Sequence, residues 1–245
     1  MKKPIIYLSA LLTLLFWFIA GVIPQDEGYH NFADCRHFSG IPNSLDVLSN
    51  VPFLFVGIAG IFLLLKRGVA LKSTFPMYLT FFIFVTVVGL GSTYYHLNPN
   101  SQTLVWDRLP MSIAFMALLS FIVAEYIDEG LAKRIFPWLL VAGVGSVVYW
   151  ALFNDLRPYA IVQFFPLICL PVILWRNKNE SSKWLWAALF FYVLAKVFEA
   201  TDWQIFRLSG ELVSGHSVKH VVSALATLMI LFKVKASKTK KCESV

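Results

Sequence analysis

Eight stretches of 17 to 23 mostly apolar residues run through this chain and constrain its fold more than any other feature. A helix needs about 20 such residues to cross the hydrocarbon core of a bilayer. Because backbone groups in lipid must be satisfied within the structure, and no alternating barrel pattern is present, we predict helices. The expected fold is an all-α, multi-pass transmembrane bundle with spans at 5–23, 45–65, 75–97, 104–125, 135–153, 159–175, 184–201 and 212–232.

The composition supports lipid as the main solvent of the chain. Hydrophobic residues make up 58% of the sequence and charged residues only 14%, whereas soluble domains carry about 25% charged residues. The net charge of +7 does not indicate nucleic-acid binding, because the basic residues lie in the loops between apolar stretches. The cysteines Cys35, Cys169 and Cys242 form no C-x-x-C pair and imply no disulfide framework.

The distribution of basic residues predicts the topology. With the N-terminus in the cytoplasm and eight crossings, 15 of the 21 Lys and Arg residues lie in cytoplasmic segments and 4 on the opposite side. Both termini are then cytoplasmic. We expect an uncleaved N-terminal helix at 1–24, since no small-x-small cleavage site precedes Gln25, a helical domain at 25–233 and a basic cytoplasmic tail at 234–245.

This topology brings four ionisable side chains to one membrane face. His96 ends the third expected helix on the extracytoplasmic side, Asp107 opens the fourth there, and His216 and His220 begin the eighth. Ionisable residues at membrane depth are costly and therefore indicate function. We expect these residues to form one site toward the extracytoplasmic face.

The spacing of these residues is typical of a catalytic zinc site. His216 and His220 stand four residues apart on one helix face, as do Ser92 and His96. Three imidazoles and an open water position are a known ligand set of catalytic zinc. Asp107 is the candidate general base, and Ser92 the candidate donor to an oxyanion.

Each of these residues also has a purely structural alternative. Interfacial histidines can hydrogen-bond across helices, and Ser92 can pack against a neighbouring helix or bond its own backbone. Asp107 can pair with Arg108 or cap its helix. It is their convergence on one membrane face that favours a metal site.

The motifs resemble those of the alkaline ceramidases. Gly-Ser-Thr-Tyr-Tyr-His at 91–96, Asp107 eleven residues later and Gly-His-Ser-Val-Lys-His at 215–220 agree with that family in order and interval. The family belongs to a superfamily of seven-helix membrane hydrolases that includes adiponectin-receptor-type proteins. The resemblance covers about 29–232 and implies a seven-helix core after one extra N-terminal helix.

The resemblance also implies residue roles and a reaction. His96, His216 and His220 would bind Zn²⁺, Asp107 would activate water, and Ser92 would stabilise the oxyanion. The implied reaction is hydrolysis of ceramide, or of a related N-acyl lipid of the membrane, to a sphingoid base or amine and a fatty acid.

A second metal is implied before the second expected helix. Animal-type alkaline ceramidases carry an acidic, tryptophan-bearing calcium site in this segment. Here the carboxylates are fewer and Arg36 lies among them, but oxygen ligands for Ca²⁺ are available from Asn31, Asp34, Asn43 and Asp46. The alternative is a polar loop that covers the active site.

Three other functions remain open from the residues. One is a receptor-like or binding membrane protein of the same fold, with a structural zinc and no turnover. Another is a haem or copper protein with paired histidines, although no Met or Cys lies near them in the sequence, as copper sites often require. A transporter is disfavoured, because the ionisable residues gather at one membrane face and not at the midplane. Lys196 and Glu199 are expected to pair, and Glu199 and Asp202 are expected to meet Lys219 or Arg207.

Overall fold

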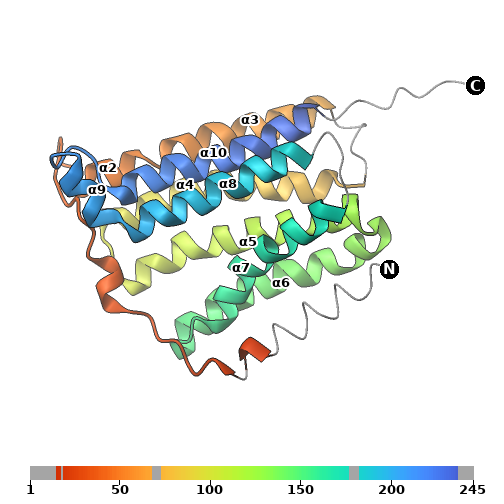
Figure 1. The fold of residues 1–245 in the computed structure, drawn as a ribbon, viewed down its shortest axis with the longest axis horizontal. Helices are drawn as coiled ribbons and strands as arrows, with labels where there is room; N and C mark the ends of the chain where they lie inside the picture. Colours follow the sequence, from red (N-terminus) through yellow and green to blue (C-terminus); the bar gives the residue numbers. More distant parts are fainter. Residues whose placement is uncertain (1–14, 18, 68–72, 177–181, 237–245) are drawn as a thin grey trace, which may run out of the picture.

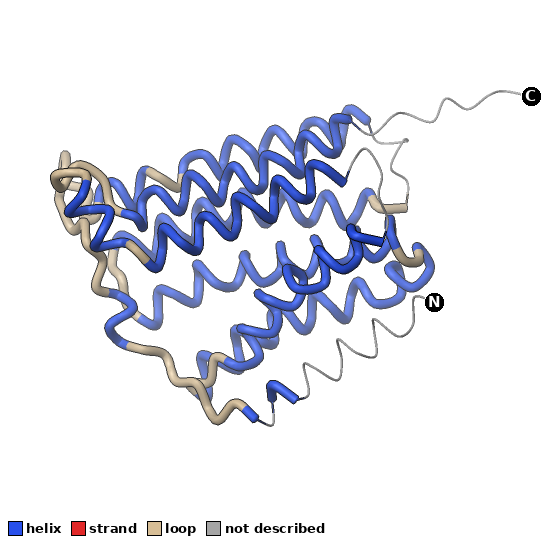
Figure 2. The backbone as a smooth tube through the Cα atoms, viewed as in Figure 1, coloured by secondary structure: helices blue, strands red, loops and turns tan. Residues whose placement is uncertain are grey.

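The structure is a computed structural model that describes residues 15–17, 19–67, 73–176 and 182–236. Within these ranges all regular elements are helices, and the one β-bridge, between Phe38 and Ile41, is isolated (Figure 2). The elements are η1 (Glu27–His30), α2 (Ser44–Leu48), α3 (Val51–Arg67), α4 (Phe75–Leu97), α5 (Ser101–Tyr126), α6 (Glu129–Phe153), α7 (Arg157–Arg176), α8 (Ser182–Ala200), α9 (Asp202–Leu208) and α10 (Gly215–Ala236).

Six helical segments of this structure are long and apolar enough to cross a membrane. A seventh is obtained if α8 and α9, which meet at a 78° bend, count as one span. The prediction of an all-helical, multi-pass membrane bundle is therefore confirmed. The first expected span, 5–23, lies mostly outside the described residues.

Capping residues explain why two of the helices begin earlier than the sequence predicts. Helix α4 has the predicted bounds, but α5 begins three residues early, because the Asn100 side chain accepts hydrogen bonds from the amides of Gln102 and Thr103. Asp107 consequently lies in the second turn of α5 and does not open the helix. Likewise α6 begins at Glu129, because Asp128 caps it through the Leu131 amide.

The long helices lie side by side, and α2 and α9 gather with the connecting segments at one end of the bundle (Figure 1). Helix α4 packs between α3 and α5, α5 also contacts α6 and α7, and α10 packs between α8 and α3. Large apolar side chains such as Phe55, Phe62 and Ile168 remain 64–70% exposed on the outer faces. An outer surface of this kind is suited to lipid.

Two glycines allow close backbone approaches at the end that carries α2 and α9. A Cβ atom at Gly91 would lie 2.1 Å from the Trp106 carbonyl oxygen, so α4 and α5 meet here at backbone distance. A Cβ atom at Gly215 would lie 2.4 Å from the Phe198 carbonyl oxygen, where α10 meets α8. Both glycines directly precede a predicted site residue, Ser92 or His216, and bring the helices that carry these residues together.

An ion pair links three helices toward the other end of the bundle. The Lys233 side chain of α10 is 1% exposed, and its ammonium pairs with Glu125 of α5 and donates to the Tyr78 hydroxyl of α4 at 2.8 Å. The Tyr78 hydroxyl in turn donates to Glu125 at 2.5 Å. The buried lysine charge is thus compensated within the protein.

We expect Glu125→Gln to destabilise the protein by about 3 kcal/mol, because the change removes the carboxylate that pairs with a buried ammonium group. Glu129→Gln is the matched control, since the Glu129–Lys133 pair is about half exposed on both sides and solvent screening leaves such surface pairs with little effect on stability. Unfolding in detergent by denaturant titration measures both variants. Equal stabilities of the two variants would contradict a stabilising role for the Lys233 pair.

Candidate metal centre and active site

The three predicted histidine ligands converge on one point. His96 lies in the last turn of α4, and His216 and His220 lie in the first two turns of α10. One ring nitrogen from each histidine lies within 4.8 Å of the other two, and the Nε2 atoms of His96 and His216 are 3.2 Å apart. All three side chains are buried. Among the described residues, these three histidines form a cluster of side chains that could hold a metal.

The donor set fits a divalent ion such as zinc. Two ligand nitrogens on one tetrahedral zinc are roughly 3.3 Å apart, close to the separation of the His96 and His216 nitrogens. The Nδ1 atom of His96 is buried and has no hydrogen-bond partner in the described part of the chain. The Nε2 atom of His96, which faces Nε2 of His216, is therefore the atom that would bind the ion.

A serine orients the third imidazole. The Oγ atom of Ser49, at the end of α2, lies 2.8 Å from Nδ1 of His220 and donates its own proton to the Asp46 carbonyl. The hydroxyl must then accept from Nδ1–H, which leaves Nε2 of His220 unprotonated and able to bind metal. Such outer partners fix the tautomer of metal-binding histidines.

We expect Ser49→Ala to weaken zinc affinity by about 10- to 100-fold, because the His220 ring loses its orienting partner. Competition with a chromogenic chelator measures the affinity. The matched control is Ser112→Ala, which removes a buried hydroxyl that bonds only its own helix carbonyl at Leu109. Equal affinities of the two variants would show that Ser49 does not orient His220.

The start of α10 is anchored by side chains from distant segments. The Ser214 hydroxyl caps the helix by accepting from the Ser217 amide, and the Ser217 hydroxyl donates to Asp46 at 2.6 Å. One oxygen of Asp202 accepts from the His216 amide at 2.7 Å, and the other accepts from the Ala33 amide at 2.9 Å. Asp46 and Asp202 thereby fix the helical turn that carries the two histidines.

The predicted acid–base pair lies beside the histidines. Ser92 of α4 is buried, and its side chain hydrogen-bonds Asp107 of α5, a contact between helices that meet closely at Gly91. Ser92, Asp107 and His220 line the same cavity. The structure therefore brings together all five residues that the sequence analysis assigned to the zinc site.

The cavity has a volume of about 250 Å³ and two chemically distinct ends. The polar end contains the residues above together with Arg108, Lys196, Glu199 and Lys219. The rest of the wall is mainly apolar and includes Phe81, Met111, Phe115, Leu118, Leu170 and Leu189. A cavity with one polar end and a long apolar wall matches an amphipathic molecule such as a lipid.

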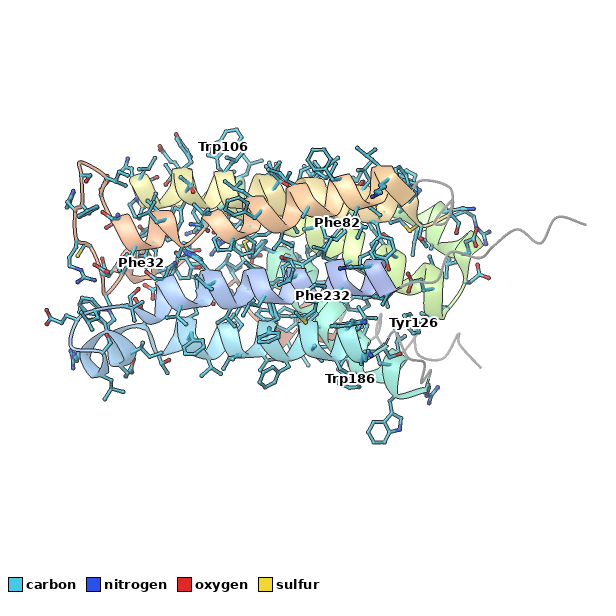
Figure 3. The ribbon with its side chains drawn as sticks, turned by 90° about the horizontal axis from the view of Figure 1, so that it is seen from above. Phe32, Phe82, Trp106, Tyr126, Trp186 and Phe232 are labelled. Carbon is cyan, nitrogen blue, oxygen red and sulfur yellow. The ribbon has the colours of Figure 1, made fainter. Side chains whose placement is uncertain are left out.

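The segment between η1 and α2 covers the histidines. The Phe32 ring is buried and lies 4.1 Å from the His216 ring and 4.9 Å from the His96 ring, centroid to centroid. In Figure 3 Phe32 lies at one end of the bundle, with Tyr126 and Trp186 at the other. His30, the last residue of η1, contacts the Tyr95 hydroxyl at 2.8 Å. The alternative reading of this loop as a cover for the site agrees with these contacts.

Three of the four residues considered for calcium bond other parts of the protein through their side chains. Asp34 forms a bidentate ion pair with Arg36. Burial raises the pKa of Asp34, but the hydrogen bonds and charge of Arg36 outweigh burial and hold this pKa below its usual value. The Asn43 amide donates to the His96 carbonyl, Asp46 accepts from Ser217, and Asn31 is exposed. A calcium site here stays a prediction.

The predicted charge pairs are confirmed at the polar end of the cavity. Glu199 of α8 binds the ammonium groups of Lys196 at 2.5 Å and Lys219 at 2.6 Å. The Tyr29 hydroxyl lies 3.4 Å from the same carboxylate. Arg207, the other partner considered, is exposed on α9.

Sequence reasoning missed the supporting residues Phe32, Ser49 and Asp202. Their contacts with the histidines join residues 14 to 184 positions apart, and no spacing pattern within the sequence predicts them. Asn50, the next residue after Ser49, donates to the Asp46 carbonyl and stabilises the break between α2 and α3.

Comparison with known proteins agrees with this site. The family model described as Ceramidase matches residues 33–243, a range that includes all five site residues. The chain is also similar to a Dictyostelium discoideum protein described as "Putative alkaline ceramidase dcd3A", with 26% identity over 113 residues, or 46% of this chain and 36% of that protein. The match thus spans about a third of the length of that curated relative. Since the family model matches most of the chain, this protein belongs to the ceramidase family.

Proposed function

We propose that this protein is a zinc-dependent amide hydrolase that acts on ceramide or a related N-acyl lipid within the membrane. The observation that carries the proposal is the convergence of three buried imidazoles with the Ser92–Asp107 pair at the polar end of a largely apolar cavity. Membership in the ceramidase family supports the same reaction. When bound, zinc supplies a nucleophilic water near neutral pH and polarises the carbonyl of a substrate.

Asp107 is assigned as the general base and acid. Its carboxylate lines the cavity beside His220 and can accept the proton of the attacking water. The same group, once protonated, can deliver that proton to the nitrogen of the leaving amine. The hydrogen bond from Ser92 holds the carboxylate in place where α4 and α5 meet.

Ser92 is assigned as the donor to the developing oxyanion. Its hydroxyl hydrogen-bonds Asp107 in the resting structure. Rotation about its side chain would turn the same proton toward the carbonyl oxygen of a substrate when charge develops there. Donors of this kind stabilise the transition state more than the ground state.

The site lies where the amide of a membrane lipid lies. His96 ends a span and His216 begins one, so the metal centre is at the headgroup level and not at the bilayer midplane. The apolar wall of the cavity can then hold the acyl chain, with entry from the same leaflet. From the distribution of Lys and Arg, we assign both termini to the cytoplasm and the site to the extracytoplasmic face.

Metal analysis combined with a lipid panel tests the proposal. The purified protein is expected to contain one zinc per chain and to release fatty acid from at least one N-acyl lipid, with ceramides of several chain lengths in the panel. Removal of zinc by a chelator should stop the reaction, and zinc should restore it. A protein without stoichiometric metal, or a metal-loaded protein that cleaves no N-acyl lipid, would refute the proposal.

A further inference from the structure

A buried arginine in the cavity wall has no anionic partner. Arg108 of α5 is 6% exposed, and its Nη1 atom is buried without a hydrogen-bond partner. Among the described residues, no carboxylate lies within ion-pair distance of its guanidinium. The other buried or half-buried cations near the cavity, Lys196 and Lys219, both have Glu199.

Aromatic rings pack around this guanidinium but do not supply the hydrogen-bond acceptors that its N–H groups need. Its central carbon lies 4.2 Å from the centroid of Trp150, 4.9 Å from that of Tyr159 and 5.5 Å from that of Tyr29. Cation–π contacts stabilise the charge, yet ring faces do not accept the planar N–H donors. A buried arginine is costly unless an acceptor completes it. The rings therefore fix the position of a guanidinium that can accept a further partner from a molecule bound in the cavity.

The charges at the polar end of the cavity favour an anionic acceptor. Three cationic side chains line this end, Arg108, Lys196 and Lys219, but only two carboxylates, Asp107 and Glu199. Glu199 is shared by the two lysines. The wall thus carries an excess of positive charge before any metal is added. A neutral headgroup would leave Arg108 unpaired, whereas a carboxylate, phosphate or sulfonate matches its fork of donors.

We propose that Arg108 binds an anionic group on the headgroup of the lipid, so that the preferred substrates are N-acyl lipids with a carboxylate, phosphate or sulfonate close to the amide. This inference rests on the proposed function. Arg108 lines the same cavity as Asp107, and its charge is near enough to act on the Asp107 carboxyl group. An anion at Arg108 therefore belongs to the part of the lipid next to the bond to be cleaved, while the acyl chain follows the apolar wall.

Equilibrium binding to the chelator-treated protein tests the inference without turnover. The probes are N-oleoylglycine and N-oleoylethanolamine, which share the acyl chain and amide and differ in headgroup charge. The wild type is expected to bind N-oleoylglycine about 10- to 100-fold more tightly, the range for a hydrogen bond to a charged group. Arg108→Gln should reduce this preference to about twofold or less, and Arg108→Lys, which keeps the charge without the fork, should retain part of it.

Arg207→Gln is the matched control, because it removes an exposed arginine from α9 at the same end of the bundle. It should keep the full preference. Helical content and elution profile report folding of each variant, and Arg108→Lys carries the test if Arg108→Gln does not fold. Equal binding of the two lipids by the wild type, or an unchanged preference in folded Arg108 variants, would overturn the inference.

Two further arms separate this inference from the proposed function. If oleate alone binds as tightly as N-oleoylglycine, and in an Arg108-dependent way, the arginine recognises a released fatty acid and the headgroup assignment is wrong. If the zinc-loaded protein cleaves both N-acyl lipids with the same efficiency, the inference fails while the amide hydrolase stands. If anionic lipid binds through Arg108 but no N-acyl lipid is cleaved, the anion site stands and the hydrolase does not.

Discussion

Replacement of His216 by alanine is expected to abolish stoichiometric zinc binding and lipid hydrolysis together. Its Nε2 atom lies 3.2 Å from that of His96, and its ring packs against Phe32, so alanine removes one of three ligands from the centre of the site. Two imidazoles leave a site short of the three protein ligands that catalytic zinc requires. Elemental analysis of the purified variant and release of fatty acid measure the two losses.

The variant must be compared with a protein that lost a histidine elsewhere. His37→Ala is suitable, because His37 is exposed in the loop before α2 and outside the metal group. It should keep one zinc per chain and full activity. A His216→Ala protein that retains a full complement of zinc would show that the metal lies elsewhere in the molecule.

The membrane solvent makes the spans predictable from sequence. In lipid only long apolar helices satisfy the backbone, so the stretch at 75–97 coincides with α4. The end of each helix then fixes the depth of the residue it carries, and charge counting places His96 and His216 at one face. The i, i+4 spacing adds the direction of the side chains, and for this reason the five residues that converge in the structure could be named from the sequence.

Contacts made by loops could not be predicted in this way. Phe32 covers the histidines from a segment without helical periodicity, and Asp202 reaches the His216 amide of α10 because the chain bends by 78° after α8. Both contacts depend on tertiary structure that no local pattern encodes. Asp46 illustrates the same point, since its carboxylate accepts hydrogen bonds from Ser214, directly before α10, and from Ser217 in α10, which are 168 and 171 residues away.

Arg108 shows how sequence adjacency can mislead. The sequence suggested a pair with neighbouring Asp107, but consecutive residues of a helix do not face each other. In the structure Asp107 bonds Ser92 of α4, while Arg108 lies among Trp150 and Tyr159 of α6 and α7. The two side chains therefore take separate positions in the cavity wall.

Asp107→Asn is expected to lower kcat for lipid hydrolysis by about 10²- to 10⁴-fold, the usual contribution of general acid–base catalysis. The amide has the shape of the carboxylate and can keep the contact with Ser92, but it cannot take up the proton of water. Zinc content is expected to stay at one per chain, because Asp107 is not a member of the metal group. Binding of an N-acyl lipid, measured without turnover, should change little.

A variant that keeps its metal but loses turnover distinguishes a catalytic zinc from a structural one. A receptor-like protein would have no turnover to lose, and the wild type and the variant would then behave alike in every lipid assay. Asp128→Asn is the control, since Asp128 caps α6 at an exposed position and asparagine is an equally good cap. If Asp107→Asn cleaves lipid as fast as Asp128→Asn, the proton passes through another group, and the role assigned to Asp107 is wrong.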